Sequence, residues 1–115
     1  MFLAEVCLET NDVIRLAEFY RRLFLIEEEN KDEVHQLIIG GQVAITVYND
    51  GAVKNNQNNN ISLAFTVDDV DKEYDRLHEM GITIIEPPTT RPWGARNMHF
   101  CDPDGNHIYF RSFPG

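Results

Sequence analysis

The sequence has no long apolar run and no secretory signal at its start. A membrane-spanning helix needs about 20 predominantly apolar residues, and every apolar stretch in these 115 residues is far shorter. The first residues, 1–5, lack the basic start and the apolar core of a secretory signal. We therefore expect a cytoplasmic protein with no membrane partner.

Basic residues are scarce as well. Ten Lys and Arg stand against 19 Asp and Glu, which gives a formal net charge of −9 at pH 7. Phosphate backbones are bound by clustered positive charge, so no nucleic-acid partner is expected. The same acidic balance could attract a cationic small molecule.

The sequence has only two cysteines, Cys7 and Cys101, which lie far apart. They form neither a Cys-x-x-Cys motif nor the framework of a disulfide-rich fold. Both lie in strand-like apolar stretches, where a free thiol behaves as a small hydrophobic side chain. A thiol that lines a pocket is the alternative.

One pattern occurs twice along the chain and indicates a duplicated unit. Residues 5–10 alternate like a strand, Asp12 can cap a helix, and residues 13–24 carry apolar side chains at helical spacing. Residues 62–67 alternate again, and Asp69 precedes a second helical pattern over residues 70–80, which Gly81 can end.

Short strand candidates follow each predicted helix, so each unit reads as βαβββ. In the first unit they are 25–29, 33–39 and 42–48, and in the second 83–86, 95–101 and 107–113. The units span about 1–48 and 61–115 of one domain, joined by an asparagine-rich linker over 49–60. Three prolines in 87–94 predict an irregular segment there.

The alternation also predicts two faces for each sheet. Apolar positions should pack beneath the helices: Val6, Leu8, Leu63, Phe65, Val67, Ile108 and Phe110. Small, polar and charged positions should line the other face: Glu5, Cys7, Glu9, Ser62, Ala64, Thr66, His107, Tyr109 and Arg111. Two such sheets curving towards each other would enclose a partly polar cleft suited to a small molecule.

Three motifs carry a family resemblance: FYRRLF at 19–24, AFTVDDVDKEYDRL at 64–77 and RPWGARNMHFCDPDGNHIYF at 91–110. With them the chain resembles the vicinal-oxygen-chelate superfamily of glyoxalases, bleomycin-resistance proteins and dioxygenases. The resemblance implies an α+β fold in which two tandem βαβββ modules form curved mixed sheets around a cleft. It also implies a homodimer, and the sequence leaves open whether modules pair within a chain or between chains.

The resemblance places the family's usual metal ligands at Glu5, Ser62 and Tyr109. A serine hydroxyl is a poor ligand, and a phenol has an ordinary pKa near 10. We therefore expect no metal at that site and no cofactor. His99 and His107 lie on neighbouring predicted strands, where they either make hydrogen bonds or combine with Glu5 or Cys101 as an improvised metal site.

The expected function is metal-independent binding of a small molecule, as in bleomycin-resistance members. The candidate ligand-binding residues are Glu5, Cys7, Ser62, Trp93, Arg96, His99, Tyr109 and Arg111. Carboxylates at the cleft would favour a cationic guest, and aromatic residues would add stacking or cation–π contacts.

A lyase, isomerase or dioxygenase-like enzyme is the alternative. Glu5 would act as general base, Tyr109 or His99 would donate a proton, and Arg96 and Arg111 would hold an anionic substrate. The sequence leaves open whether any reaction is catalysed.

Overall fold

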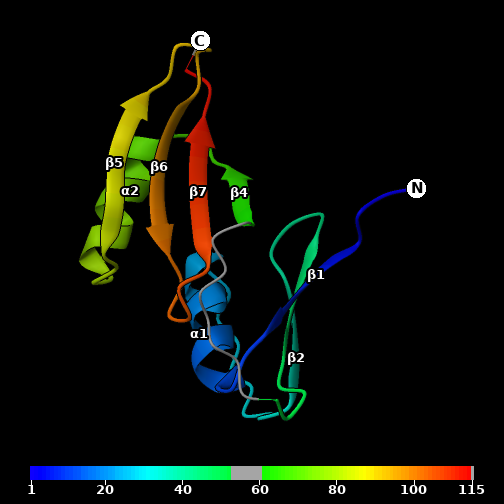
Figure 1. Ribbon diagram of the computed structural model, residues 1–115. Helices are drawn as coiled ribbons and strands as arrows, with labels where there is room; N and C mark the ends of the chain where they lie inside the picture. Colours follow the sequence, from blue (N-terminus) through cyan, green and yellow to red (C-terminus); the bar gives the residue numbers. More distant parts are fainter. Residues whose placement is uncertain (53–60, 115) are drawn as a thin grey trace. The chain divides into compact units, whose positions relative to one another are not determined.

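The computed structural model describes residues 1–52 and 61–114. The chain divides into two compact units, Met1–Asn56 and Gln57–Gly115. In each unit one helix packs against a sheet, so the predicted α+β class is confirmed (Figure 1). Most of the expected linker over 49–60 lies outside the described residues. Within the described part of the chain, no helix is both long and apolar enough to cross a membrane.

The first unit contains one strand fewer than predicted. Its elements are β1 (Glu5–Glu9), α1 (Val13–Leu23), β2 (His35–Ile39) and β3 (Ala44–Tyr48). The sheet order is β1-β3-β2, with β1 parallel and β2 antiparallel to β3. The first unit therefore reads βαββ instead of βαβββ.

The predicted strand over 25–29 is wrong because the end of α1 turns the chain there. Leu25 takes a left-handed conformation with φ 58°, and the Ile26 N–H donates to the carbonyl of Arg21 at 2.8 Å. This closure satisfies carbonyls at the helix end. The exposed carboxylates of residues 27–29 then leave little apolar surface for a strand to bury.

The segment after this turn is tied down by a polar network. Gln36 in β2 is buried, and its amide N–H groups donate to the carbonyls of Asn30 and Asp32 at 3.0 and 2.9 Å. Its carbonyl accepts from the buried guanidinium of Arg21 in α1. One glutamine therefore links the helix, the strand and the irregular segment between them.

The second unit has the predicted βαβββ order. It contains β4 (Ser62–Thr66), α2 (Val70–Glu79), β5 (Ile84–Thr90), β6 (Arg96–Cys101) and β7 (His107–Ser112). The sheet order is β4-β7-β6-β5, with β4 parallel to β7 and the other pairs antiparallel. The helix ends where Gly81 takes φ 80°, as the sequence indicates.

The expectation that prolines make residues 87–94 irregular is wrong for its first part. Strand β5 continues through Pro87 and Pro88 to Thr90. Among the described residues it is an edge strand that pairs with β6 alone, and its register shifts between Ile84 and Glu86 and again before Thr89. An edge strand tolerates proline because one side of it needs no ladder hydrogen bonds.

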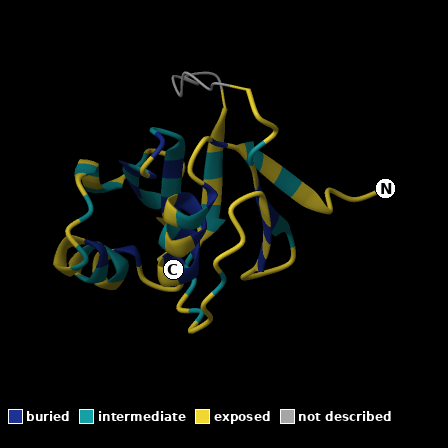
Figure 2. Cartoon of the chain, turned by 90° about the horizontal axis from the view of Figure 1, so that it is seen from below, coloured by how far each residue is buried: buried dark blue, intermediate teal, exposed yellow. Residues whose placement is uncertain are grey.

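The predicted two-faced strands are present in both units. Ile108 and Phe110 of β7 are buried, as are Met98 and Phe100 of β6. The intervening residues of β6 and β7 are half-buried or exposed. Figure 2 shows the same alternation as bands along β1, beside the N-terminus.

The turn between β6 and β7 is held by the buried side chain of Asp102. Its Oδ1 accepts from the backbone N–H groups of Asp104 and Asn106, both at 2.9 Å, and its Oδ2 accepts from the Asn106 amide at 2.8 Å. Gly105 takes φ 85°, which a side chain would strain. The turn predicted from these residues thus fixes the register of the two strands that it joins, β6 and β7.

Replacing Asp102 by Ala removes all three of these hydrogen bonds. Because bonds to a charged acceptor contribute more than neutral ones, we expect the free energy of unfolding to fall by about 2–4 kcal/mol. Asp75→Ala, on the exposed surface of α2, should change it by less than about 0.5 kcal/mol. Urea denaturation of both variants measures the difference, and equal losses would contradict this role for Asp102.

Candidate functional site

The helix-free face of the second sheet is lined mainly by polar residues, which the strand register sets in three rows. The row nearest the Asp102 turn holds Ser62, His107 and Cys101. The middle row holds Ala64, Tyr109, His99 and Glu86. The third row holds Thr66, Arg111, Asn97 and Thr89.

The middle row contains a stacked pair of rings. His99 and Tyr109 lie face to face, with ring centroids 4.3 Å apart and planes 7° from parallel. Both side chains are half-buried. Each ring therefore covers one face of the other, and the pair leaves its outer ring faces, its ring edges and a polar atom on each ring to contact a ligand.

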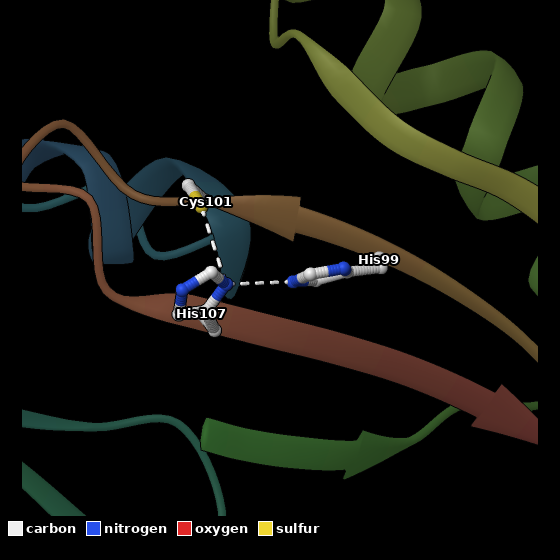
Figure 3. Close-up of side chains that lie close together, drawn as sticks. All are labelled: His99, Cys101 and His107. Carbon is white, nitrogen blue, oxygen red and sulfur yellow. Dashed lines mark hydrogen bonds between the residues drawn. The ribbon is translucent and has the colours of Figure 1, made fainter. Parts of the chain in front are cut away.

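The first and middle rows meet in a cluster of possible metal ligands, drawn in Figure 3. His99 Nε2 lies 2.8 Å from His107 Nδ1, and Cys101 Sγ lies 3.7 Å from the same nitrogen. Among the described residues, these three form the one group of His, Cys, Asp or Glu ligand atoms that gathers closely enough for a metal, all within 4.8 Å of one another.

The surroundings of this cluster favour neutral side chains. Burial, and then the neighbouring His107, lowers the pKa of His99 below its ordinary value of 6.5. Burial, and then the carboxylate of Asp102, raises the pKa of the Cys101 thiol above 9.0. At pH 7 the cluster therefore presents a neutral imidazole at His99 and a protonated thiol.

Arg111, in the third row, is the one arginine of the second unit without a carboxylate partner among the described residues. Its Nε donates to the Thr66 hydroxyl at 3.2 Å, and its guanidinium lies 5.3 Å from the centroid of the Phe113 ring. The other three, Arg76, Arg91 and Arg96, pair with Glu73, Glu86 and Asp71 respectively. Arg111 thus offers an exposed cation on a polar face.

Arg96 does not join this group. It shares the parity of the buried Met98 and Phe100, so it lies on the helix side of β6. Its Nε and Nη2 both donate at 2.9 Å to the carboxylate of Asp71 in α2, and its Nη1 donates to Thr90. Arg96 therefore links β6 to α2 through a hydrogen-bonded ion pair with Asp71.

Two other candidates of the second unit lie at its surface. Trp93 is in the tight turn between β5 and β6, where Gly94 takes φ 97°, and it is 72% exposed. Ser62 begins β4 and is exposed beside His107. At this exposure the Trp93 side chain is not part of the core formed by the described residues of the second unit.

The remaining candidates belong to the first unit, where Glu5, Cys7 and Glu9 form the exposed side of β1. Burial, and then the carboxylates of Glu5, Glu9 and Asp50, raises the pKa of the Cys7 thiol. In the second unit, the strand register brings His99, Tyr109 and Arg111 together on one face.

Sequence reasoning grouped Cys101 mainly with buried apolar residues and did not select Asn97 or Glu86. The structure places Cys101 half-buried on the polar face, two residues from His99. The signal that could have found it is the alternation of β6, since residues 97, 99 and 101 share one side of a strand.

The positions that correspond to the family metal site do not form a suitable ligand set. Ser62 presents an exposed hydroxyl. Tyr109 offers a phenol in place of a carboxylate, and its ring is stacked on His99. Glu5, in the other unit, is the one charged oxygen donor of the three. Hydroxyl and phenol oxygens are weak ligands for a divalent metal at neutral pH.

Comparison with known proteins gives a family and a fold. The model of the Glyoxalase/Bleomycin resistance protein/Dioxygenase superfamily matches residues 3–110. A 47-residue stretch, 40% of this chain and 37% of the other, is 53% identical to the uncharacterized protein YraH of Bacillus subtilis.

Two solved structures share the fold at low sequence identity. A conserved domain protein matches with TM-score 0.83 at 20% identity, covering 99% of this chain and 100% of that one. A lactoylglutathione lyase from Agrobacterium tumefaciens matches with TM-score 0.75 at 20% identity, covering 96% and 92%.

The Asp71–Arg96 pair predicts a pH dependence of stability. The hydrogen bond from Arg96 lowers the pKa of Asp71 below 3.8, its ordinary value. Because the folded pKa is the lower one, the pair stabilises the fold above pH 3.8, and this contribution disappears as the pH falls through the folded pKa.

Asp71→Asn should therefore be less stable than the wild type at pH 7 and equally stable once Asp71 is protonated. Denaturant titrations at several pH values measure this convergence. Asp75→Asn, on the same helix and without an arginine partner in the described part of the chain, should show no such convergence. A constant difference between wild type and Asp71→Asn at every pH would be evidence against the pair.

Proposed function

The chain belongs to the glyoxalase/bleomycin resistance protein/dioxygenase superfamily, and we propose that it binds a small planar molecule bearing a carboxylate on the helix-free face of its second unit. The observation that carries the proposal is the position of Arg111. This guanidinium without a carboxylate partner among the described residues lies one row from the stacked rings of His99 and Tyr109.

Arg111 is suited to hold the carboxylate. A guanidinium presents its N–H donors in a planar fork that matches a carboxylate, and the bidentate pair is stronger than neutral hydrogen bonds. The Thr66 hydroxyl accepts from Nε, which restrains the side chain. The remaining N–H groups of this exposed side chain are then available to a guest.

The stacked rings are suited to hold the planar part of the ligand. His99 is neutral at pH 7, because burial and His107 lower its pKa, and the outer face of its ring can stack on a planar ligand. The Tyr109 hydroxyl can donate a hydrogen bond beside it. Apolar and aromatic walls with a few polar groups are typical of small-molecule sites.

Local charge supports an anionic guest, although the total charge of −9 favours a cationic one. The Debye length at physiological ionic strength is about 8 Å, so charges in direct contact with the ligand outweigh distant ones. On this face the one carboxylate of the three rows, Glu86, is already paired with Arg91. Arg111 therefore makes the local charge on this face positive.

The proposal uses no metal at Glu5, Ser62 and Tyr109. The enzymatic alternative keeps Glu5 as a general base. Under that alternative, Glu5→Gln abolishes turnover of a bound ligand and leaves its binding affinity nearly unchanged. Under binding without chemistry, the ligand is recovered unaltered from the wild type.

We also propose that the chain forms a homodimer. Each sheet has two edge strands, β1 and β2 in the first and β4 and β5 in the second. Unpaired edges offer N–H and C=O groups to another chain. Light scattering of the purified protein measures its molar mass in solution. The mass of a monomer at micromolar concentration would contradict the proposed homodimer.

Binding of a panel of aromatic and heteroaromatic carboxylates, each compared with its amide, tests the proposed function. We expect the wild type to bind a carboxylate about 10- to 100-fold more tightly than the matching amide, as a charged hydrogen-bonded pair contributes about 1.5–3 kcal/mol. Arg111→Gln should remove this preference.

Arg96→Gln is the matched control, since the same substitution falls on the same sheet but on its helix side. It should keep the preference for the carboxylate. Equal affinities of the wild type and Arg111→Gln for every carboxylate in the panel, measured by calorimetry, would exclude Arg111 as the anchor.

A further inference from the structure

Three side chains of the second unit converge on one point near the Asp102 turn. Cys101 and His107 are direct partners across β6 and β7, and His99 lies two residues before Cys101 on the same face. His99 Nε2 is 2.8 Å and Cys101 Sγ 3.7 Å from His107 Nδ1, as Figure 3 shows. We propose that His99, Cys101 and His107 bind one Zn²⁺ ion at this point.

Hydrogen bonding alone accounts poorly for this arrangement. A ring nitrogen such as His107 Nδ1 carries either one proton or one lone pair, yet two groups are directed at it. If His99 makes the hydrogen bond with His107 Nδ1, Cys101 has no strong bond with that nitrogen, and the reverse holds if Cys101 makes it. A cation between them accepts a lone pair from all three side chains at once.

The distances are close to those of a tetrahedral zinc site. Bonds of about 2.05 Å to nitrogen and 2.3 Å to sulfur imply separations of about 3.3 Å between nitrogens and 3.6 Å between nitrogen and sulfur. The Cys101 to His107 separation of 3.7 Å fits, and the histidine nitrogens at 2.8 Å need to part slightly. Small rotations of the two rings supply that movement.

The donor set selects the kind of metal. Two imidazoles and one thiolate suit Zn²⁺ and other borderline or soft ions, whereas Ca²⁺ and Mg²⁺ require oxygen ligands. The neighbouring Asp102 carboxylate already accepts three hydrogen bonds within its turn. Three protein ligands leave a fourth position for water, as in zinc sites that bind exogenous groups.

The cluster is also held in place before any metal arrives. The His99 ring is stacked on Tyr109, and Cys101 and His107 flank a turn fixed by Asp102. Restraint of this kind lowers the ordering cost of binding. The Cys101 thiol releases its proton when the metal binds.

Cobalt substitution tests the site directly. The full chain, reduced and freed of metal with a chelator, is titrated with Co²⁺ at pH 7.5 or above. We expect one equivalent to bind, with a thiolate-to-cobalt charge-transfer band in the near ultraviolet and the visible bands of tetrahedral cobalt. Zn²⁺ should displace the cobalt and remove both. Absence of the charge-transfer band in the wild type would overturn the proposal, whatever the variants do.

The two cysteines provide a matched pair of variants. Cys101→Ser should lose the charge-transfer band and weaken Zn²⁺ binding by more than about 100-fold, since even outer-shell changes cost about 10- to 100-fold. Cys7→Ser, which removes the free thiol of the other unit, should bind as the wild type does. A band that persists in Cys101→Ser and is lost in Cys7→Ser would assign the metal elsewhere.

Histidine variants complete the assignment and separate it from the proposed function. His99→Gln and His107→Gln should each weaken Zn²⁺ binding, whereas His78→Gln, on the exposed side of α2, should not. Arg111→Gln should bind Zn²⁺ as the wild type does, so loss of carboxylate binding and loss of metal binding are independent results. Circular dichroism of each variant excludes unfolding as the cause of a loss, and an effect of His78→Gln equal to that of His99→Gln would overturn the ligand set.

Discussion

The antiparallel register of β6 and β7 is the constraint on which the second unit depends. Neighbouring residues of a strand point to opposite faces, so a slip of one residue would exchange the two faces of β6. Met98 and Phe100 would then reach solvent, and His99 and Cys101 would enter the core beneath α2. The Asp102 carboxylate prevents this slip, because its three hydrogen bonds set where β6 ends and β7 begins.

The same strands supply both the core and the candidate site, and this explains how the polar face is kept in position. Ile108 and Phe110 anchor β7 in the core from one side, while His107, Tyr109 and Arg111 project from the other. Arg96 adds a link between β6 and α2 through Asp71. The side chains of the polar face are therefore carried by backbone that the core restrains, as precise binding geometry requires.

The sequence predicted what depends on local chemistry, namely the helix caps at Asp12 and Asp69, the alternation of β7 and the Asp102 turn. It did not predict features that depend on a residue's partners in the folded chain or on an unusual backbone conformation. The turn after α1 is local, but Leu25 takes the left-handed conformation that usually marks a glycine, so the sequence does not show it. The edge position of β5 is a tertiary feature, and it explains the prolines inside a strand. The carboxylate partners of arginines are equally hidden in the sequence. Asp71 lies 25 residues before Arg96, so no local spacing shows this pair, although the alternation of β6 places Arg96 on the side of Met98 and Phe100.

The zinc cluster and the carboxylate anchor adjoin each other at His99. His107 and Arg111 are four residues apart on β7, which at about 3.3 Å per residue corresponds to about 13 Å along the strand. His99 lies nearer, because it pairs with Tyr109, only two residues and about 7 Å from Arg111 along the strand. This is within the Debye length of about 8 Å at physiological ionic strength, so a bound cation would add to the attraction of this face for an anion. His99 is also both a metal ligand in the cluster and half of the stacked pair. A carboxylate ligand therefore senses the metal through its charge as well as through the orientation of His99.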